Sequence, residues 1–155
     1  MSVVLDTSAI VAAYDRADPG HEAVAELLRA LDDELVTTPL VAAQMDRALA
    51  GTDGRDALWK DLDSGAITVR WWADAMDETL RIARRHPVLG LADASLVALA
   101  GRLRTDRIAT FDEHFRSVTL PRGRRIVMLP DNERGARLDR PRRPVSAPSN
   151  DPGKD

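Results

Sequence analysis

The sequence contains no cysteine, which excludes disulfide bridges, zinc–thiolate sites, iron–sulfur clusters and cysteine nucleophiles. Aromatic residues make up only 4% of the chain, and no apolar run approaches the roughly 20 residues of a membrane-spanning helix. The N-terminus has no basic region followed by an apolar stretch, so we expect no signal peptide, no membrane association and a cytoplasmic protein. A glycine-rich phosphate loop is also missing, which argues against a nucleotide-binding switch.

The residues that are present are typical of a globular protein of 155 residues, because 44% are hydrophobic and 30% are charged. The net charge is −3. Residues 131–155 hold six basic and five acidic side chains, so the remaining part of the chain carries a net charge of −4. An acidic domain of this kind would need a local basic patch or bound cations to handle a nucleic acid.

Composition divides the chain into two parts. Residues 1–130 have the apolar content of a single folded domain, whereas residues 131–155 are rich in Arg, Pro, Asp and Ser and have few large apolar side chains. Such a segment cannot bury enough surface to offset the entropy lost on ordering. We therefore predict a disordered Arg/Pro-rich tail at 131–155.

Short apolar runs alternate with helical patterns through the first part. Strands are expected at 3–5, 34–37, 66–69, 107–110 and 126–129, and helices at 8–14, 24–31, 39–49, 56–62, 72–83 and 92–103. In the fifth of these helices, Trp72, Met76, Leu80 and Ala83 form one apolar stripe. This alternation predicts an α/β fold, a three-layer α/β/α sandwich around a mostly parallel sheet of about five strands.

Three aspartates stand where such a fold places ligands. Asp6 directly follows the first expected strand, and Asp112 closely follows the fourth. Asp93 begins the most apolar helix, where a carboxylate is costly unless it is paired, hydrogen-bonded or bound to a metal. Each also has a structural explanation, as a helix cap, a turn residue or a charge stabilised by a helix N-terminus.

Taken together, the three aspartates favour a metal site. The carboxyl ends of parallel strands meet at one edge of a sheet, so Asp6, Asp93 and Asp112 can converge there. Clustered carboxylates repel one another without a cation, and hard oxygen ligands select Mg²⁺ or Mn²⁺. Such ions at open carboxylate sites promote phosphoryl chemistry.

Four segments in this order resemble the PIN-domain ribonucleases, specifically the VapC-type toxins of bacterial toxin–antitoxin pairs. They are residues 3–10, which contain Asp6, residues 38–44, residues 89–95, which contain Asp93, and residues 108–115, which contain Asp112. The resemblance implies a PIN-like domain at 1–130 and a Mg²⁺- or Mn²⁺-dependent endoribonuclease, with Asp6, Asp93 and Asp112 as metal ligands. It also implies an RNA substrate, a small VapB-like antitoxin protein that covers the acidic site, and a homodimer.

One position departs from the family pattern, because Gln44 stands where the family usually carries glutamate. Gln44 keeps a carbonyl ligand but loses the charge, so we expect it at the catalytic site with a weakened second metal position. Asp46 is two residues away on the same predicted helix, turned by about 200°, and cannot replace it. Either the natural protein is a weak nuclease, or a Glu→Gln change was introduced to disarm a toxin.

Two rival functions remain. The first is a PIN-like domain, weak or inactive because of Gln44, that binds RNA or a protein partner. The second is a phosphatase similar to the haloacid dehalogenases, which needs a second aspartate two residues after the nucleophile, where this chain has Ser8.

Other side chains give weaker signals. Thr7, Ser8 and Thr110 are candidates for hydrogen bonds to the carboxylates or caps of helices. The three histidines show no ligand spacing, and we expect them at the surface or in packing. The tryptophans are expected in the core or at a partner interface rather than stacked on bases. Candidates for phosphate contacts are Arg84, Arg85, Arg102, Arg104 and Arg107.

Overall fold

The computed structural model describes residues 1–130. The predicted tail at 131–155 therefore lies outside the described residues. Five parallel strands form one sheet in the order β3-β2-β1-β4-β5, with β1 at Ser2–Leu5, β2 at Glu34–Thr37, β3 at Thr68–Val69, β4 at Arg107–Ala109 and β5 at Val127–Leu129. The central strand β1 is the most deeply buried, since Val3, Val4 and Leu5 are inaccessible to solvent.

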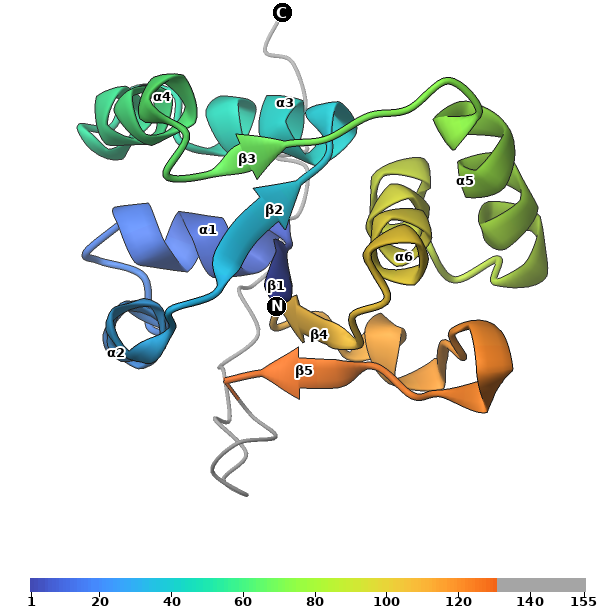
Figure 1. The fold of residues 1–155 in the computed structure, drawn as a ribbon. Coiled ribbons are helices and arrows are strands. Elements are labelled where there is room, and N and C mark those ends of the chain that lie inside the picture. Colours follow the sequence, from blue (N-terminus) through green and yellow to red (C-terminus); the bar gives the residue numbers. More distant parts are fainter. Residues whose placement is uncertain (131–155) are drawn as a thin grey trace, which may run out of the picture.

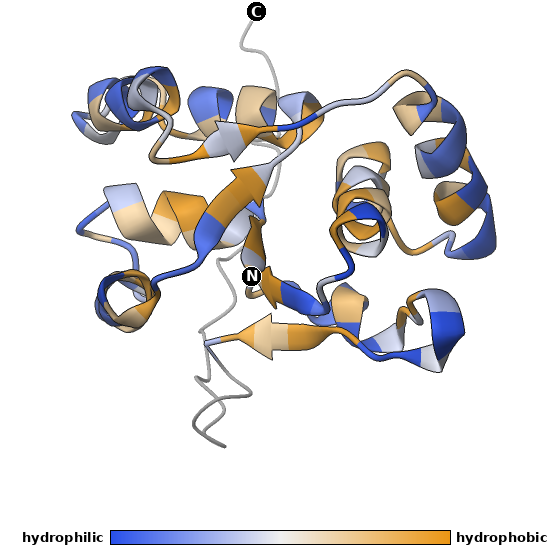
Figure 2. Ribbon diagram, in the orientation of Figure 1, coloured by the Kyte–Doolittle hydropathy of each residue, from blue (hydrophilic) through white to orange (hydrophobic). Residues whose placement is uncertain are grey.

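Helices cover both faces of this sheet and complete the three predicted layers (Figure 1). One face carries α1 (Thr7–Tyr14), α2 (His21–Ala30), α3 (Pro39–Ala48) and α4 (Gly54–Ser64), and the other carries α5 (Ala75–Arg85) and α6 (Leu91–Leu103). The strands are mainly hydrophobic, whereas the outer surfaces of α4 and α5 are largely hydrophilic (Figure 2). Two short 3₁₀ helices, η1 (Glu113–Ser117) and η2 (Pro121–Gly123), connect β4 to β5.

The sequence of α6 explains its central place. Residues 94–100 of this helix are all buried, as its nearly uninterrupted apolar sequence predicts. The helix begins after Gly90 and packs most extensively against α5. Asp93 lies in its first turn and is only half buried, at the end of the helix nearest the carboxyl edge of the sheet.

Two predicted elements are shorter than expected. The third strand was predicted over 66–69 but contains only Thr68–Val69, because the backbone N–H of Ile67 donates to the carbonyl of Asp61 and holds the preceding residues in a turn. Helix α5 begins at Ala75, so Trp72 precedes it. Of the predicted stripe, Trp72 and Ala83 pack against the core, but Met76 is 39% exposed, and the fully buried residues of the helix are Ala75 and Thr79.

Helix α1 packs closely against α4. The Tyr14 hydroxyl donates a short hydrogen bond to the Asp61 carboxylate. Gly54, the first residue of α4, lies so close to Tyr14 that an added Cβ would be 2.6 Å from its carbonyl oxygen. None of the helices within residues 1–130 is long and apolar enough to cross a bilayer.

Candidate active site

The parallel sheet brings Asp6 and Asp112 to the same edge of the molecule. Asp6 follows β1 and Asp112 lies three residues beyond β4, and these two strands are neighbours in the sheet. The Asp6 backbone N–H donates to the carbonyl of Ala109 at 3.0 Å, which extends the pairing of the two strands up to the site. The sheet topology therefore places both carboxylates where ligands bind in parallel α/β proteins.

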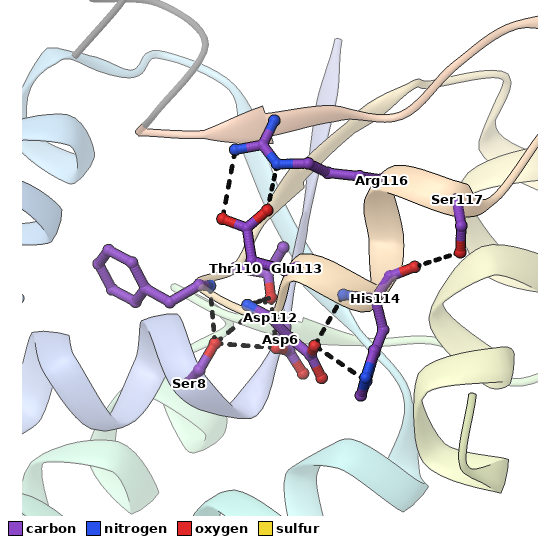
Figure 3. A network of polar contacts seen from close by, with 9 residues as sticks. Asp6, Ser8, Thr110, Asp112, Glu113, His114, Arg116 and Ser117 are labelled. Carbon is purple, nitrogen blue, oxygen red and sulfur yellow. Dashed lines mark hydrogen bonds and ion pairs between the residues drawn. The ribbon is translucent and has the colours of Figure 1, made fainter. Parts of the chain in front are cut away.

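Asp6 is held by three hydrogen-bond donors and is only 4% exposed. Its Oδ1 accepts from the backbone N–H of Thr7 at 2.7 Å, so it caps α1. Its Oδ2 accepts from the hydroxyls of Ser8 at 2.9 Å and Thr110 at 2.6 Å (Figure 3). These bonds fix the orientation of the carboxylate and confirm that both hydroxyls serve it.

Burial raises the pKa of the Asp6 carboxyl above its ordinary value, and the Asp112 carboxylate contributes to the rise. The hydrogen bonds from Thr110, Ser8 and Thr7 act in the opposite direction, because they favour the charged form. Burial has the largest effect. An ionised Asp6 is therefore costly in this position unless a positive charge comes close to it.

Asp112 is the second acid of the site and is oriented by its own segment of chain. Its backbone N–H donates to the Thr110 hydroxyl at 2.9 Å, and its Oδ1 accepts from the backbone N–H of His114 at 2.9 Å (Figure 3). The ring Nδ1 of His114 lies 3.2 Å from the same Oδ1. The aspartate side chain is 35% exposed, so one side of it remains open to solvent.

Asp93 is the third acid of the group and comes from the first turn of α6, in one of the helical layers. Its pKa is raised to about 6, first by burial and then by the carboxylates of Asp6 and Asp112. His114 lowers it in part. Because the Asp6 and Asp112 carboxylates raise the pKa of Asp93, and Asp112 also raises that of Asp6, the three side chains lie near one another although they come from two strand ends and one helix.

Gln44 contacts the residue that follows Asp6 in the chain. Its Oε1 accepts a hydrogen bond from the Thr7 hydroxyl at 3.1 Å, one residue from Asp6, and its side chain is exposed. Asp46, in contrast, is paired with Arg55 at 2.7 Å and accepts from the Trp59 indole at 2.6 Å. Asp46 is thus engaged in contacts between α3 and α4 and does not replace the missing carboxylate.

A buried hydrogen bond connects the two helices that carry Gln44 and Asp93. The hydroxyls of Thr38 and Ser95 are 2.7 Å apart, and both residues are inaccessible to solvent. Thr38 also caps α3, since its hydroxyl accepts from the backbone N–H of Val41. The bond fixes the starts of α3 and α6 relative to each other, at the edge of the sheet where the acids lie.

The three aspartates suit a divalent cation by their chemistry. All three are hard oxygen donors, and the raised pKa of Asp6 and of Asp93 shows that their charged forms are disfavoured here, a cost that a bound cation would offset. Within residues 1–130, however, no group of three His, Cys, Asp or Glu side chains is already arranged as a ligand cluster. A cation bound by all three side chains would need their carboxylates closer together than they are in this structure.

Sequence reasoning missed one residue of the site. His114 was expected at the surface or in packing, and it is indeed exposed, but it also lies against Asp112 and affects the pKa of Asp93. The available signal was its position two residues after Asp112, where the chain turns into η1. Among the tryptophans, Trp72 packs against the core, whereas Trp59 and Trp71 are 50% and 40% exposed and are therefore not core residues.

Comparisons with known proteins agree with this geometry. Residues 3–120 match the family model of the PIN domain. The chain is 35% identical over 135 residues to Ribonuclease VapC26 of Mycobacterium tuberculosis, with 83% of this chain and 100% of the relative covered. The chain therefore belongs to the PIN-domain family.

Solved structures show the same fold at lower sequence identity. The Mycobacterium tuberculosis toxin VapC20, described as cleaving the sarcin–ricin loop, has a TM-score of 0.66 and 20% identity, covering 72% of this chain and 90% of that one. VapBC2 of Rickettsia felis, solved with a DNA fragment from its promoter, has a TM-score of 0.59 and 13% identity, covering 83% of this chain and 97% of that one. Both confirm the predicted PIN-like architecture.

Proposed function

We propose that this chain is an endoribonuclease that acts as the toxin of a toxin–antitoxin pair. The observation that carries the proposal is the group of three aspartates at the carboxyl edge of a PIN-domain sheet, where the carboxylates of Asp6 and Asp112 raise the pKa of Asp93. The identity of 35% to a curated VapC ribonuclease over most of both chains supports the same activity.

The three aspartates differ in burial, and we assign them different roles in holding a cation. Asp6 is the fixed ligand, because Ser8 and Thr110 hold its carboxylate and it cannot turn away. Asp93 and Asp112 are more exposed than Asp6, so a cation that they help to hold would be accessible to an incoming phosphodiester. Mg²⁺ or Mn²⁺ held by these three side chains would supply Lewis acidity that neutralises charge on the phosphate and lowers the pKa of water.

Gln44 stands where the PIN-domain ribonucleases usually carry a glutamate, so it would offer a cation a fourth side-chain oxygen without a negative charge. Its contact with Thr7 supports a role in positioning substrate or cation near Asp6. This substitution also favours the second candidate function, a PIN domain with weak or no catalysis that binds RNA or a protein partner. The two candidates differ in whether purified protein cleaves RNA, and in whether Gln44→Glu increases the rate.

The proposal includes a protein partner. A neighbour of the same fold was solved as a VapBC assembly, and the acidic edge of the present chain is open for a basic segment to cover. We propose a VapB-like antitoxin there, a homodimeric toxin and a cytoplasmic location, where RNA is available.

The test is cleavage of a structured RNA by protein purified free of any partner. We expect cleavage with Mg²⁺ or Mn²⁺, none with EDTA, and loss of cleavage in Asp93→Asn. RNA binding without cleavage at any cation concentration, unchanged by Gln44→Glu, would instead establish the non-catalytic candidate.

A further inference from the structure

A groove of about 800 Å³ lies between α5, α6 and the η2 segment, separate from the three aspartates. Four exposed arginines line it: Arg81 and Arg85 from α5, Arg102 from α6 and Arg122 from η2. The hydrophilic surfaces of α5 and of the η2 segment lie on the same side of the molecule (Figure 2). This concentration of positive charge contrasts with the net charge of −4 carried by the chain outside residues 131–155.

The positive charges of these four arginines are only weakly compensated by acidic side chains nearby. Among the residues that the structure describes, Arg85 and Arg122 form no ion pair, and the Nε of Arg81 donates to a carbonyl of its own helix. Arg102 is 3.8 Å from Glu78, a long ion pair, and its guanidinium lies 5.0 Å from the centre of the Trp72 ring. Most of the guanidinium donors therefore remain available to an anionic ligand.

Two elements connect the groove to the acidic site. Helix α6 carries Asp93 in its first turn and Arg102 nine residues later, a separation of about 13 Å along the helix axis. The η1–η2 segment begins beside Asp112 and continues to Arg122. A stacked nucleic-acid strand advances about 3.4 Å per nucleotide, so about four nucleotides separate the two places.

We propose that this arginine groove binds the RNA backbone a few nucleotides away from the phosphodiester that is cleaved. The inference depends on the proposed ribonuclease function and names where its substrate is held. The acidic site repels a polyanion in the absence of a cation, so the groove provides the attraction that the rest of the acidic surface lacks. An acidic protein segment is the other occupant that the charge allows; RNA is favoured because the groove lies about four nucleotides from the aspartates, so that one RNA strand can reach both.

The test measures binding without cleavage. A fluorescently labelled single-stranded RNA of twelve nucleotides is titrated with protein in EDTA, and anisotropy is recorded at several salt concentrations. The variant Arg85→Gln/Arg122→Gln removes two groove charges, and Arg16→Gln/Arg29→Gln removes two charges from exposed arginines near α1 and α2, on the opposite face of the sheet. Thermal unfolding checks that all three proteins are folded.

We expect the groove variant to bind RNA about tenfold more weakly, and the slope of log K against log salt to fall by about 1.4, which corresponds to two lost phosphate contacts. The control variant should bind as the wild type does. Unchanged affinity and slope in the groove variant would overturn the proposal and leave a protein partner as the occupant; an equal loss in both variants would overturn it by showing non-specific attraction. Because no cleavage is needed, a failure of the ribonuclease assay leaves this result interpretable.

Discussion

The three aspartates of the site are held in different ways, and this difference has consequences for function. Asp6 is fixed by two hydroxyls and a backbone N–H, so its orientation is set before any ligand binds. Asp93 and Asp112 are freer, and the pKa of Asp93 is raised to about 6 by burial and by the other two acids. The site is therefore destabilised by its own charge, as expected of carboxylates arranged for a cation rather than for folding.

Neutralising Asp93 should stabilise the protein in the absence of metal. The pKa of Asp93 is raised from 3.8 in the unfolded chain to about 6 in the folded protein, so the folded protein binds this proton more tightly. The stability that the proton contributes is fully present below pH 3.8 and is lost as the pH rises through about 6. In EDTA at pH 7.5 we expect Asp93→Asn to raise the free energy of unfolding by about 1 kcal/mol, after allowance for solvent screening of a half-exposed group. Denaturant unfolding measures the difference.

The pH dependence provides the control for this stability effect. The advantage of Asp93→Asn over the wild type should shrink as the pH falls from 7.5 to 5, because the wild-type carboxyl then takes up a proton. An advantage that stays constant over this range would mean that packing, not charge, is responsible.

Restoring a carboxylate at position 44 should increase activity. The Glu side chain would add a full negative charge beside Thr7 and Asp6. Its attraction to a cation at about 4 Å is worth about 4 kcal/mol per unit charge at an effective dielectric of 20, before the cost of desolvation is deducted. One third of that is about tenfold in affinity, so we expect Gln44→Glu to raise cleavage at low Mg²⁺ at least about tenfold. Ala43→Glu, at an exposed neighbouring position of α3, adds the same charge elsewhere and should leave the rate unchanged.

At the scale of elements, the order of strands and helices was predictable because each has a clear periodicity. The segment 34–37 is a strand and 39–48 a helix capped by Thr38, very near their predicted bounds. The errors arose where tertiary contacts override the local pattern. Trp72 continues the apolar spacing of α5, yet it lies before the helix and beneath Arg102, a contact with α6 that the spacing does not reveal.

The close approach of α1 and α4 can be tested at one glycine. An added Cβ on Gly54 would be 2.6 Å from the backbone oxygen of Tyr14, and backbone cannot move aside as a flexible side chain can. We expect Gly54→Ala to lower the free energy of unfolding by about 1–3 kcal/mol. Gly90→Ala, where a Cβ meets nothing within 4 Å, should change it by much less, and equal effects of the two substitutions would contradict the argument.

At the scale of the whole molecule, the places of the three aspartates in the fold were predictable from the sequence, but the distances between their carboxylates were not. The positions of Asp6 and Asp112 after neighbouring strands follow from parallel topology, and Asp93 from its unusual place in an apolar helix. The distances between their carboxylates depend on rotamers, and a ligand cluster is not preformed in residues 1–130. The arginine groove was not predictable either, since α5, α6 and η2 meet only through tertiary packing.

The division of the chain at residue 130 remains a prediction. The composition of 131–155 offers few apolar side chains for a core, so truncation after Pro130 should leave the midpoint of thermal unfolding within about 2 °C of the full chain. Calorimetry of the two proteins measures this. A cooperative loss of stability on truncation would show that the segment contributes to the folded domain.

The most direct test of the central claim is the cation dependence of RNA cleavage in the wild type and in three single variants, Asp6→Asn, Asp93→Asn and Asp112→Asn. All four proteins are purified free of a partner and assayed on one structured RNA across a titration of Mn²⁺. We predict that wild-type cleavage depends on Mn²⁺, vanishes in EDTA, and falls at least about a hundredfold in each variant, because each removes a negative ligand from the same site. Cleavage that persists in EDTA, or that survives all three substitutions, would contradict the assignment of these aspartates as the active site.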